Sequence, residues 1–172
     1  MSEEAEDTIM LKGNESLQDA ILFAFGLENG SNTFYIKAAA KVDDPLSREF
    51  FSAMAEVEKG HMANLRLLYC GMENEACPIT IEEFVEAAPG LFMEGGKLIE
   101  NVLHELDVAF LDELDAIKIA IKQEGEAYAF YAKAAKRMED HYARVLFENL
   151  ANDEKKHLEE LTKLLKQKTG TA

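Results

Sequence analysis

Four stretches of the chain carry apolar residues at alternating steps of three and four, the spacing of helices that each bury one face. They span about residues 16–42, 46–70, 112–138 and 140–166. Alanine, leucine, glutamate and lysine are frequent in them, and the chain has only three prolines, which favours helix over sheet. The pattern predicts four long helices whose core-facing positions are Ile21, Ala24, Glu28, Ser31, Tyr35 and Ala38; Phe51, Met54, Glu58, His61, Leu65 and Leu68; Ile117, Ala120, Glu124, Ala127, Tyr131 and Ala134; and Phe147, Leu150, Glu154, His157, Leu161 and Leu164.

The connections between these helices predict a bundle with one long crossover. A short break at Asp44-Pro45 separates the first two helices, and the last two are also joined by a short turn. Residues 71–111 form the long connection, where the capping box from Thr80 to Glu83 indicates short helices. We therefore expect an all-α, single-domain protein over residues 1–172 with the crossover between helices two and three, and a loose tail over residues 1–15.

The two halves of the chain are copies of one unit. When residues 16–68 are aligned on residues 112–164 without a gap, 19 of 53 positions are identical. Unrelated sequences of average composition would share roughly one position in fifteen. The unit is a helix pair, so the sequence predicts a four-helix bundle with approximate twofold symmetry, built from a duplicated helix pair.

Six polar residues interrupt the apolar faces near their middle, where a bundle would bring them to one level. Two belong to each of two Glu-x-x-His motifs, whose side chains share a helix face because they are three residues apart. Four buried carboxylates would be costly without counter-charge, and two divalent cations would balance them. The predicted metal ligands are Glu28, Glu58, His61, Glu124, Glu154 and His157. A set of hydrogen-bonded core polar groups without metal is the alternative.

Other polar residues near these positions have less certain roles. Tyr35 and Tyr131 each follow a lone glutamate by two helical turns, so their hydroxyls are expected to hold ligand carboxylates, although a purely structural aromatic fits too. Glu126 is expected to face solvent unless a π-bulge turns it inward. His104 and His141 lie out of register, which favours a surface or packing role.

Composition narrows the function classes. The net charge is −15 without a basic stripe, which argues against nucleic acid and against anionic membrane as partners. No apolar run approaches the length of a membrane span, and the acidic start lacks an apolar signal core, so we expect a cytoplasmic protein. Cys70 and Cys77 are expected to be free thiols in a reducing cytosol, with a redox disulfide as the alternative. A four-cysteine iron or zinc site is absent.

With its symmetric Glu-x-x-His pair and its duplicated Tyr-x-Lys-Ala-Ala stretch, the chain resembles the rubrerythrin branch of the ferritin-like superfamily over roughly residues 16–167. The resemblance implies a non-haem centre of two iron ions that reduces hydrogen peroxide. It also implies that Glu58 and Glu154 bridge the irons, that Glu28 and Glu124 are terminal ligands, and that His61 and His157 each complete one iron. Manganese or zinc suits the same ligands.

Two departures from that family pattern leave other functions open. The electron-carrying rubredoxin-like domain of full rubrerythrins is missing, so an external donor such as rubredoxin is expected. Ala127 stands where full rubrerythrins carry an extra glutamate, and Glu126 is the only substitute on that helix. The leading expectation is an oxidoreductase, as a homodimer, acting on peroxide or dioxygen. A ferritin-like ferroxidase or iron store and a metal-free structural bundle are the alternatives.

Overall fold

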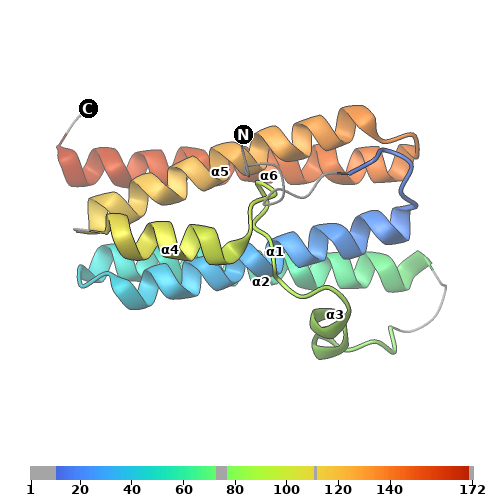
Figure 1. Cartoon of the computed structure of the whole chain (residues 1–172), viewed down its shortest axis with the longest axis horizontal. Helices are drawn as coiled ribbons and strands as arrows, with labels where there is room; N and C mark the ends of the chain where they lie inside the picture. Colours follow the sequence, from blue (N-terminus) through green and yellow to red (C-terminus); the bar gives the residue numbers. More distant parts are fainter. Residues whose placement is uncertain (1–10, 73–76, 111, 171–172) are drawn as a thin grey trace, which may run out of the picture.

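The computed structural model describes residues 11–72, 77–110 and 112–170, and in this part of the chain the predicted all-α bundle is confirmed. Four long helices run side by side, and two short helices lie in the crossover (Figure 1). None of the described helices is both long and apolar enough to cross a membrane. The helices are α1 (Leu17–Lys41), α2 (Pro45–Met72), α3 (Ile81–Ala87), α4 (Ile99–Ala109), α5 (Glu113–Arg137) and α6 (His141–Thr169).

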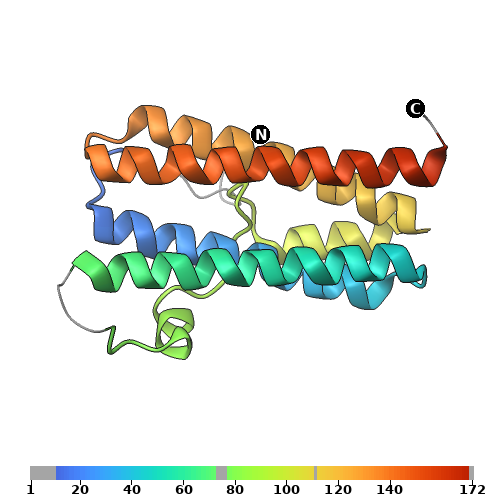
Figure 2. The same cartoon turned by 180° about the vertical axis from the view of Figure 1, so that it is seen from behind.

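Each half of the chain folds as one antiparallel helix pair, α1 with α2 and α5 with α6 (Figure 2). The turns of both pairs use the same chemistry, as expected of a duplicated unit. In each turn an aspartate accepts a hydrogen bond from the backbone three residues later, which caps the second helix, and an arginine donates to a carbonyl six residues earlier. The pairs are Ser47 N to Asp44 (2.7 Å) and Arg48 to Val42 O (3.0 Å), and Ala143 N to Asp140 (2.8 Å) and Arg144 to Met138 O (3.1 Å).

Two apolar clusters fill the bundle, one on each side of its middle. One holds Phe25 and Phe147, and the other holds Phe34 and Phe51. Between them, every helix of the bundle contributes polar side chains that are buried or nearly so. The core therefore has apolar ends and a polar middle layer, which is where the sequence placed its candidate ligands.

One predicted core position is wrong. Leu68 is 44% exposed, although the matching position in α6 is buried. In a straight helix, residues seven positions apart do not stay on the same face, because a turn contains 3.6 residues and not 3.5. The set of residues that α2 buries therefore shifts around the helix toward its C-terminal end. Met62, Leu65 and the partly buried Tyr69 continue that face, and Tyr69 packs edge-on against Phe84 of α3.

The predicted loose tail does not extend to residue 15. Leu11 is buried, and the backbone N–H of Glu139 donates to the carbonyl oxygen of Gly13 at 2.9 Å. Residues 11–15 therefore lie against the turn between α5 and α6. The remainder of the predicted tail, residues 1–10, lies outside the described residues.

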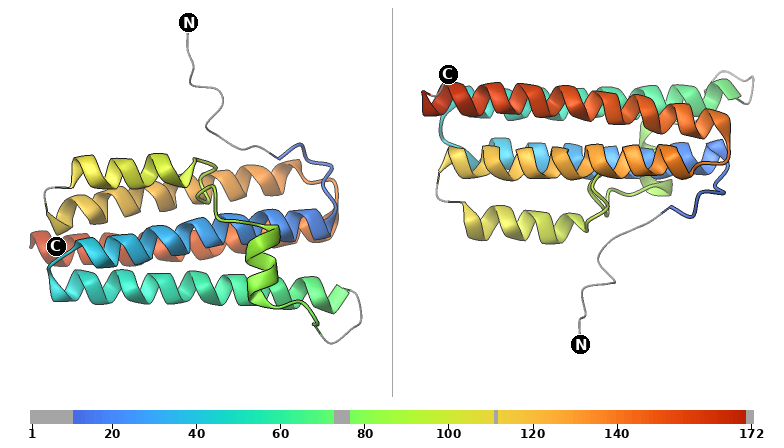
Figure 3. Two further views of the ribbon diagram at one scale, coloured as in Figure 1. Left: turned by 60° about the horizontal axis from the view of Figure 1, so that its bottom comes forward. Right: turned by 90° about the horizontal axis from the view of Figure 1, so that it is seen from above.

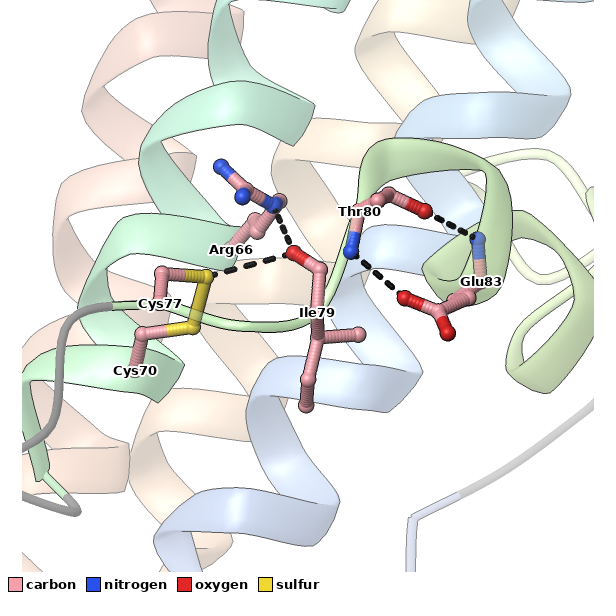
Figure 4. Close-up of a disulfide and its surroundings, with 6 residues drawn as sticks. All are labelled: Arg66, Cys70, Cys77, Ile79, Thr80 and Glu83. Carbon is pink, nitrogen blue, oxygen red and sulfur yellow. Dashed lines mark hydrogen bonds between the residues drawn. A yellow bond between two sulfur atoms is a disulfide. The ribbon is translucent and has the colours of Figure 1, made fainter.

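The expectation of two free thiols is also wrong, because Cys70 and Cys77 form a disulfide (Figure 4). The crossover comes back beside the end of α2 and brings the two Cα atoms to 4.8 Å, within the range that a disulfide spans. Nearby, Arg66 donates to the carbonyl oxygen of Ile79, and the predicted capping box at Thr80 is formed. These contacts attach the start of α3 to α2.

The crossover then passes over the middle of the bundle. It runs from α3, beside α1 and α2, to α4, which lies along α1 and α5 (Figure 3). Between these short helices the chain makes a tight loop, in which Met93 N donates to Lys97 O at 2.7 Å and Gly96 N donates to Met93 O at 2.7 Å. This loop lies at the level of the polar layer.

Candidate metal centre

The six residues singled out by the sequence come together in the polar middle layer. They form two triads, in each of which the candidate ligand atoms lie within 4.8 Å of one another. Each triad takes a lone glutamate, the histidine of one Glu-x-x-His motif and the glutamate of the other. The internal repeat converts one triad into the other, since the offset of 96 residues relates them position by position: Glu28, His61 and Glu154, and Glu124, His157 and Glu58.

The two histidines turn the same nitrogen toward the carboxylates. His61 Nδ1 lies 3.0 Å from Glu28 Oε2 and 3.2 Å from Glu58 Oε2. His157 Nδ1 lies 3.2 Å from Glu154 Oε2 and 3.5 Å from Glu58 Oε1. The rings are nearly parallel, with centroids 5.5 Å apart. The two oxygens of Glu58 therefore face different histidines, the arrangement expected of a carboxylate shared by two ions.

The two tyrosines hold carboxylates of the opposite helix. Tyr35 of α1 donates to Glu124 of α5, and Tyr131 of α5 donates to Glu28 of α1 at 3.1 Å. A helical side chain leans toward the N-terminus of its helix, so a tyrosine two turns after the glutamate reaches back to the ligand level. Both rings are buried. Each hydroxyl thus forms a hydrogen bond with one candidate ligand across the bundle.

A fifth carboxylate, which the sequence analysis missed, lies in the same cluster. Glu94 comes from the crossover loop and is 1% exposed. Its carboxylate lies within 4.8 Å of those of Glu28 and Glu58 in one group, and of Glu124 and Glu154 in another. Helical periodicity could not reveal it because it lies outside the four helices. The only signal in the sequence is a single charge between the apolar residues 91–93 and two glycines.

Burial and mutual repulsion dominate the electrostatics of the cluster. Burial, then the charges of neighbouring glutamates, raise the pKa of Glu58, Glu94 and Glu154 well above the ordinary value. Burial acts in the same direction on Glu124, but hydrogen bonds with His157, Glu154 and a tyrosine outweigh it, so its pKa is lowered. No lysine or arginine forms an ion pair with these carboxylates in the described parts of the chain.

The donor set fits two metal ions. Buried polar atoms normally have hydrogen-bond partners, yet both oxygens of Glu58 and one each of Glu124 and Glu154 have none among the described residues. Bound cations would satisfy these oxygens and neutralise the cluster. Carboxylate oxygens with one imidazole per triad suit iron, manganese or zinc, and the same arrangement is known from four-helix bundles with paired metal ions.

The metal-free protein should lose stability as the pH rises. Burial opposes a charged His61, but its hydrogen bond to Glu28 and the nearby negative charges raise its pKa from 6.5 to about 9. The folded protein then binds more protons than the unfolded chain, so this stabilisation is complete below pH 6.5 and is lost as the pH rises through about 9. The raised pKa values of Glu58, Glu94 and Glu154 also make the folded protein bind more protons than the unfolded chain, so they too lower stability as the pH rises.

The free energy of unfolding can fall by as much as about 1.4 kcal/mol per pH unit for one group whose pKa is raised in the folded protein. Thermal unfolding of chelator-treated protein between pH 6.5 and about 9 measures it. A melting temperature that rises over this interval would contradict the prediction. Metal-loaded protein, in which the bound ions have displaced the protons of the imidazole and carboxylates into solvent, is the control, and its stability should change less with pH.

The remaining polar candidates lie outside the cluster. Glu126 belongs to none of the candidate metal groups of the described residues and pairs with Lys97 of the crossover at 2.8 Å, while α5 remains a regular helix without a π-bulge. Its side chain is 31% exposed, so it is less open to solvent than expected. His104 and His141 are both exposed, which agrees with the predicted surface role.

The fold and this cluster together define the class of the protein. A four-helix bundle with one long crossover and a buried carboxylate–histidine centre is that of the ferritin-like di-iron carboxylate superfamily. Within it, the family model described as Rubrerythrin matches residues 19–165, and the chain belongs to that family. Neither a curated protein nor a solved structure matches the chain.

Proposed function

We propose that this protein is a non-haem di-iron oxidoreductase that reduces hydrogen peroxide with electrons from an external donor. The observation that carries the proposal is the pair of repeat-related triads, which offers two equivalent ion sites in one buried layer. Two iron ions would supply redox chemistry by changing between the divalent and trivalent states. Family membership supports the same class of centre. We further propose a cytoplasmic homodimer, with a small carrier such as rubredoxin as the donor.

The ligand roles follow from position. Glu58 and Glu154 are the bridging carboxylates in this proposal, because each joins a triad whose histidine belongs to the other Glu-x-x-His motif. Glu28 and Glu124 are terminal ligands, each held by a tyrosine. His61 and His157 bind one ion each through Nδ1, the nitrogen that faces the carboxylates.

The rest of the chain controls access and geometry. The apolar clusters on both sides of the polar layer exclude bulk water, which strengthens the electrostatic interactions inside. His61 is the most accessible of the six residues, with 15% of its side chain exposed, whereas the Glu28 and Glu58 side chains are fully buried. Such limited access suits a small oxidant that reaches the centre beside His61.

The tyrosines should affect turnover more than metal content. Tyr35→Phe and Tyr131→Phe each remove a hydroxyl that fixes one terminal carboxylate, while all six ligands remain. Loss of such a supporting hydrogen bond typically reduces activity by about 10- to 100-fold. We expect a drop of that size in peroxide turnover with iron content near that of the wild type. Tyr128→Phe is the matched control, since Tyr128 is 43% exposed on α5. Equal turnover in all three variants would show that the hydroxyls do not position the centre.

Iron handling is the second candidate, because a ferroxidase or storage protein uses the same kinds of ligand. Stopped-flow oxidation of the iron(II)-loaded protein by peroxide and by dioxygen separates the two functions. Our proposal predicts that peroxide is the faster oxidant and that the iron stays at the protein centre. Much faster oxidation by dioxygen, with a mineral core inside a shell-sized oligomer, would instead establish iron storage.

A further inference from the structure

We infer that Glu94 is a seventh metal ligand, shared by the two ions and supplied by the crossover. The inference rests on the proposed di-metal centre and adds to it a residue outside the duplicated unit. The six symmetric ligands come from four helices related by the repeat, whereas Glu94 lies in the crossover, outside the duplicated unit. Among the clustered carboxylates of the described residues, Glu94 therefore makes the two halves of the centre unequal.

The position of Glu94 is that of a ligand and not of a neighbouring surface charge. It is 1% exposed, and its carboxylate lies near a pair of glutamates from the first repeat and a pair that spans α5 and α6. The Tyr131 hydroxyl donates to Glu94 Oε1 at 3.4 Å, and this hydroxyl lies closer to Glu28, at 3.1 Å. No lysine or arginine forms an ion pair with Glu94 in the described structure, so the only positive charge that could balance its carboxylate in the cluster is that of bound cations or a protonated histidine.

The loop that carries Glu94 is fixed to both halves of the bundle. On α1, a Cβ added at Gly30 would overlap the carbonyl oxygen of Phe92, so only glycine allows the loop to approach so closely. On α5, Glu126 accepts a hydrogen bond from Lys97 at 2.8 Å. The backbone hydrogen bonds from Met93 N to Lys97 O and from Gly96 N to Met93 O close the loop with Glu94 at its tip. The tip therefore enters the bundle between α1 and α5.

The added carboxylate alters the charge balance of the centre. Four glutamates balance two divalent ions, and Glu94 brings one further negative charge. Two trivalent ions carry a larger positive charge, so a fifth carboxylate stabilises them more than it stabilises two divalent ions. We therefore expect Glu94 to strengthen the binding of trivalent ions in particular, and to favour the oxidised state of an iron pair.

Metal titration of a Glu94→Gln variant tests this inference. The variant keeps the size of the side chain and removes its charge. Titrations with Co(II), whose visible spectrum reports its coordination, and with Ga(III), a redox-inert trivalent ion, are made on chelator-treated full-length protein. We expect affinity for Ga(III) to fall by at least about tenfold, affinity for Co(II) to fall less, and the Co(II) spectrum to change. Without metal, the variant should melt at a higher temperature, because one of five mutually repelling buried carboxylates is gone.

Glu100→Gln is the matched control, since it removes a negative charge from an exposed residue of the crossover, outside the cluster. If both variants lose affinity equally, the effect comes from the general loss of negative charge, and Glu94 is not a ligand. Unchanged Co(II) spectra and unchanged affinities in Glu94→Gln would also overturn the inference. Failure of the wild type itself to bind two Co(II) ions would instead contradict the proposed di-metal centre, so the two failures are distinct.

Discussion

Glu58→Ala or Glu154→Ala should abolish the two-metal centre while the helical bundle still folds without metal. Each glutamate is proposed to bridge both ions, so its loss weakens both sites and not one. Alanine is the best helix former, and removing a buried carboxylate relieves repulsion in the cluster. Metal analysis after dialysis should find little bound iron. Wild-type protein gains about 4 kcal/mol of stability at a thousandfold excess of free metal over its dissociation constant, and the variants should gain almost none.

The control for this experiment is Glu56→Ala, which lies on α2 two residues from Glu58 and has a side chain that is 75% exposed. It should keep full metal content and the full stabilisation by metal. Full occupancy of both sites in either bridging variant would contradict the assigned roles. A variant that no longer folds, judged by its circular dichroism without metal, would show instead that the carboxylate is needed for the bundle itself.

Peroxide reduction should continue only when a separate electron donor is supplied. The described chain brings together one cluster of candidate metal ligands at the bundle centre, and its two cysteines are joined in a disulfide, so no second redox metal site is evident in the described residues to relay electrons. The iron(II)-loaded protein should consume peroxide in a single round and then stop. Addition of rubredoxin with a reducing system should restore continuous turnover, a change from none to many cycles.

Peroxide consumption followed over time, with and without the donor, measures this effect. Donor alone, with metal-free protein, is the control for direct reaction of the donor with peroxide. Continuous turnover without any reductant would mean that the protein disproportionates peroxide, and the role of an external donor would be wrong. Unchanged rates in metal-free protein would exclude the centre as the site of reaction.

Helical periodicity explains why most of the candidate site could be predicted. The six ligands and both tyrosines occupy regular positions on long helices, so the period of the helix determines which face they share. The repeat then places the two triads at one level, and the structure brings together all six residues that the sequence singled out. Which carboxylate each tyrosine binds could not be predicted, because the reach of each hydroxyl depends on how α1 lies against α5.

Features that depend on non-local contacts could not be predicted in this way. Glu94 enters the cluster because a loop packs directly on Gly30, sixty-four residues earlier in the chain, and no local pattern encodes that contact. The Cys70–Cys77 disulfide depends on how the crossover returns to α2. Likewise, the exposure of Leu68 follows from the rotation of a buried face toward α3. In each case tertiary packing decides the outcome.

A crystal structure of the iron-loaded protein, with anomalous diffraction recorded at the iron absorption edge, would locate the two proposed metal sites directly. We expect two anomalous peaks in the middle layer of the bundle, between Glu58 and Glu154, with His61 and His157 on different ions. An iron-saturated crystal without a peak among these residues, or with iron bound only at the protein surface, would contradict this expectation.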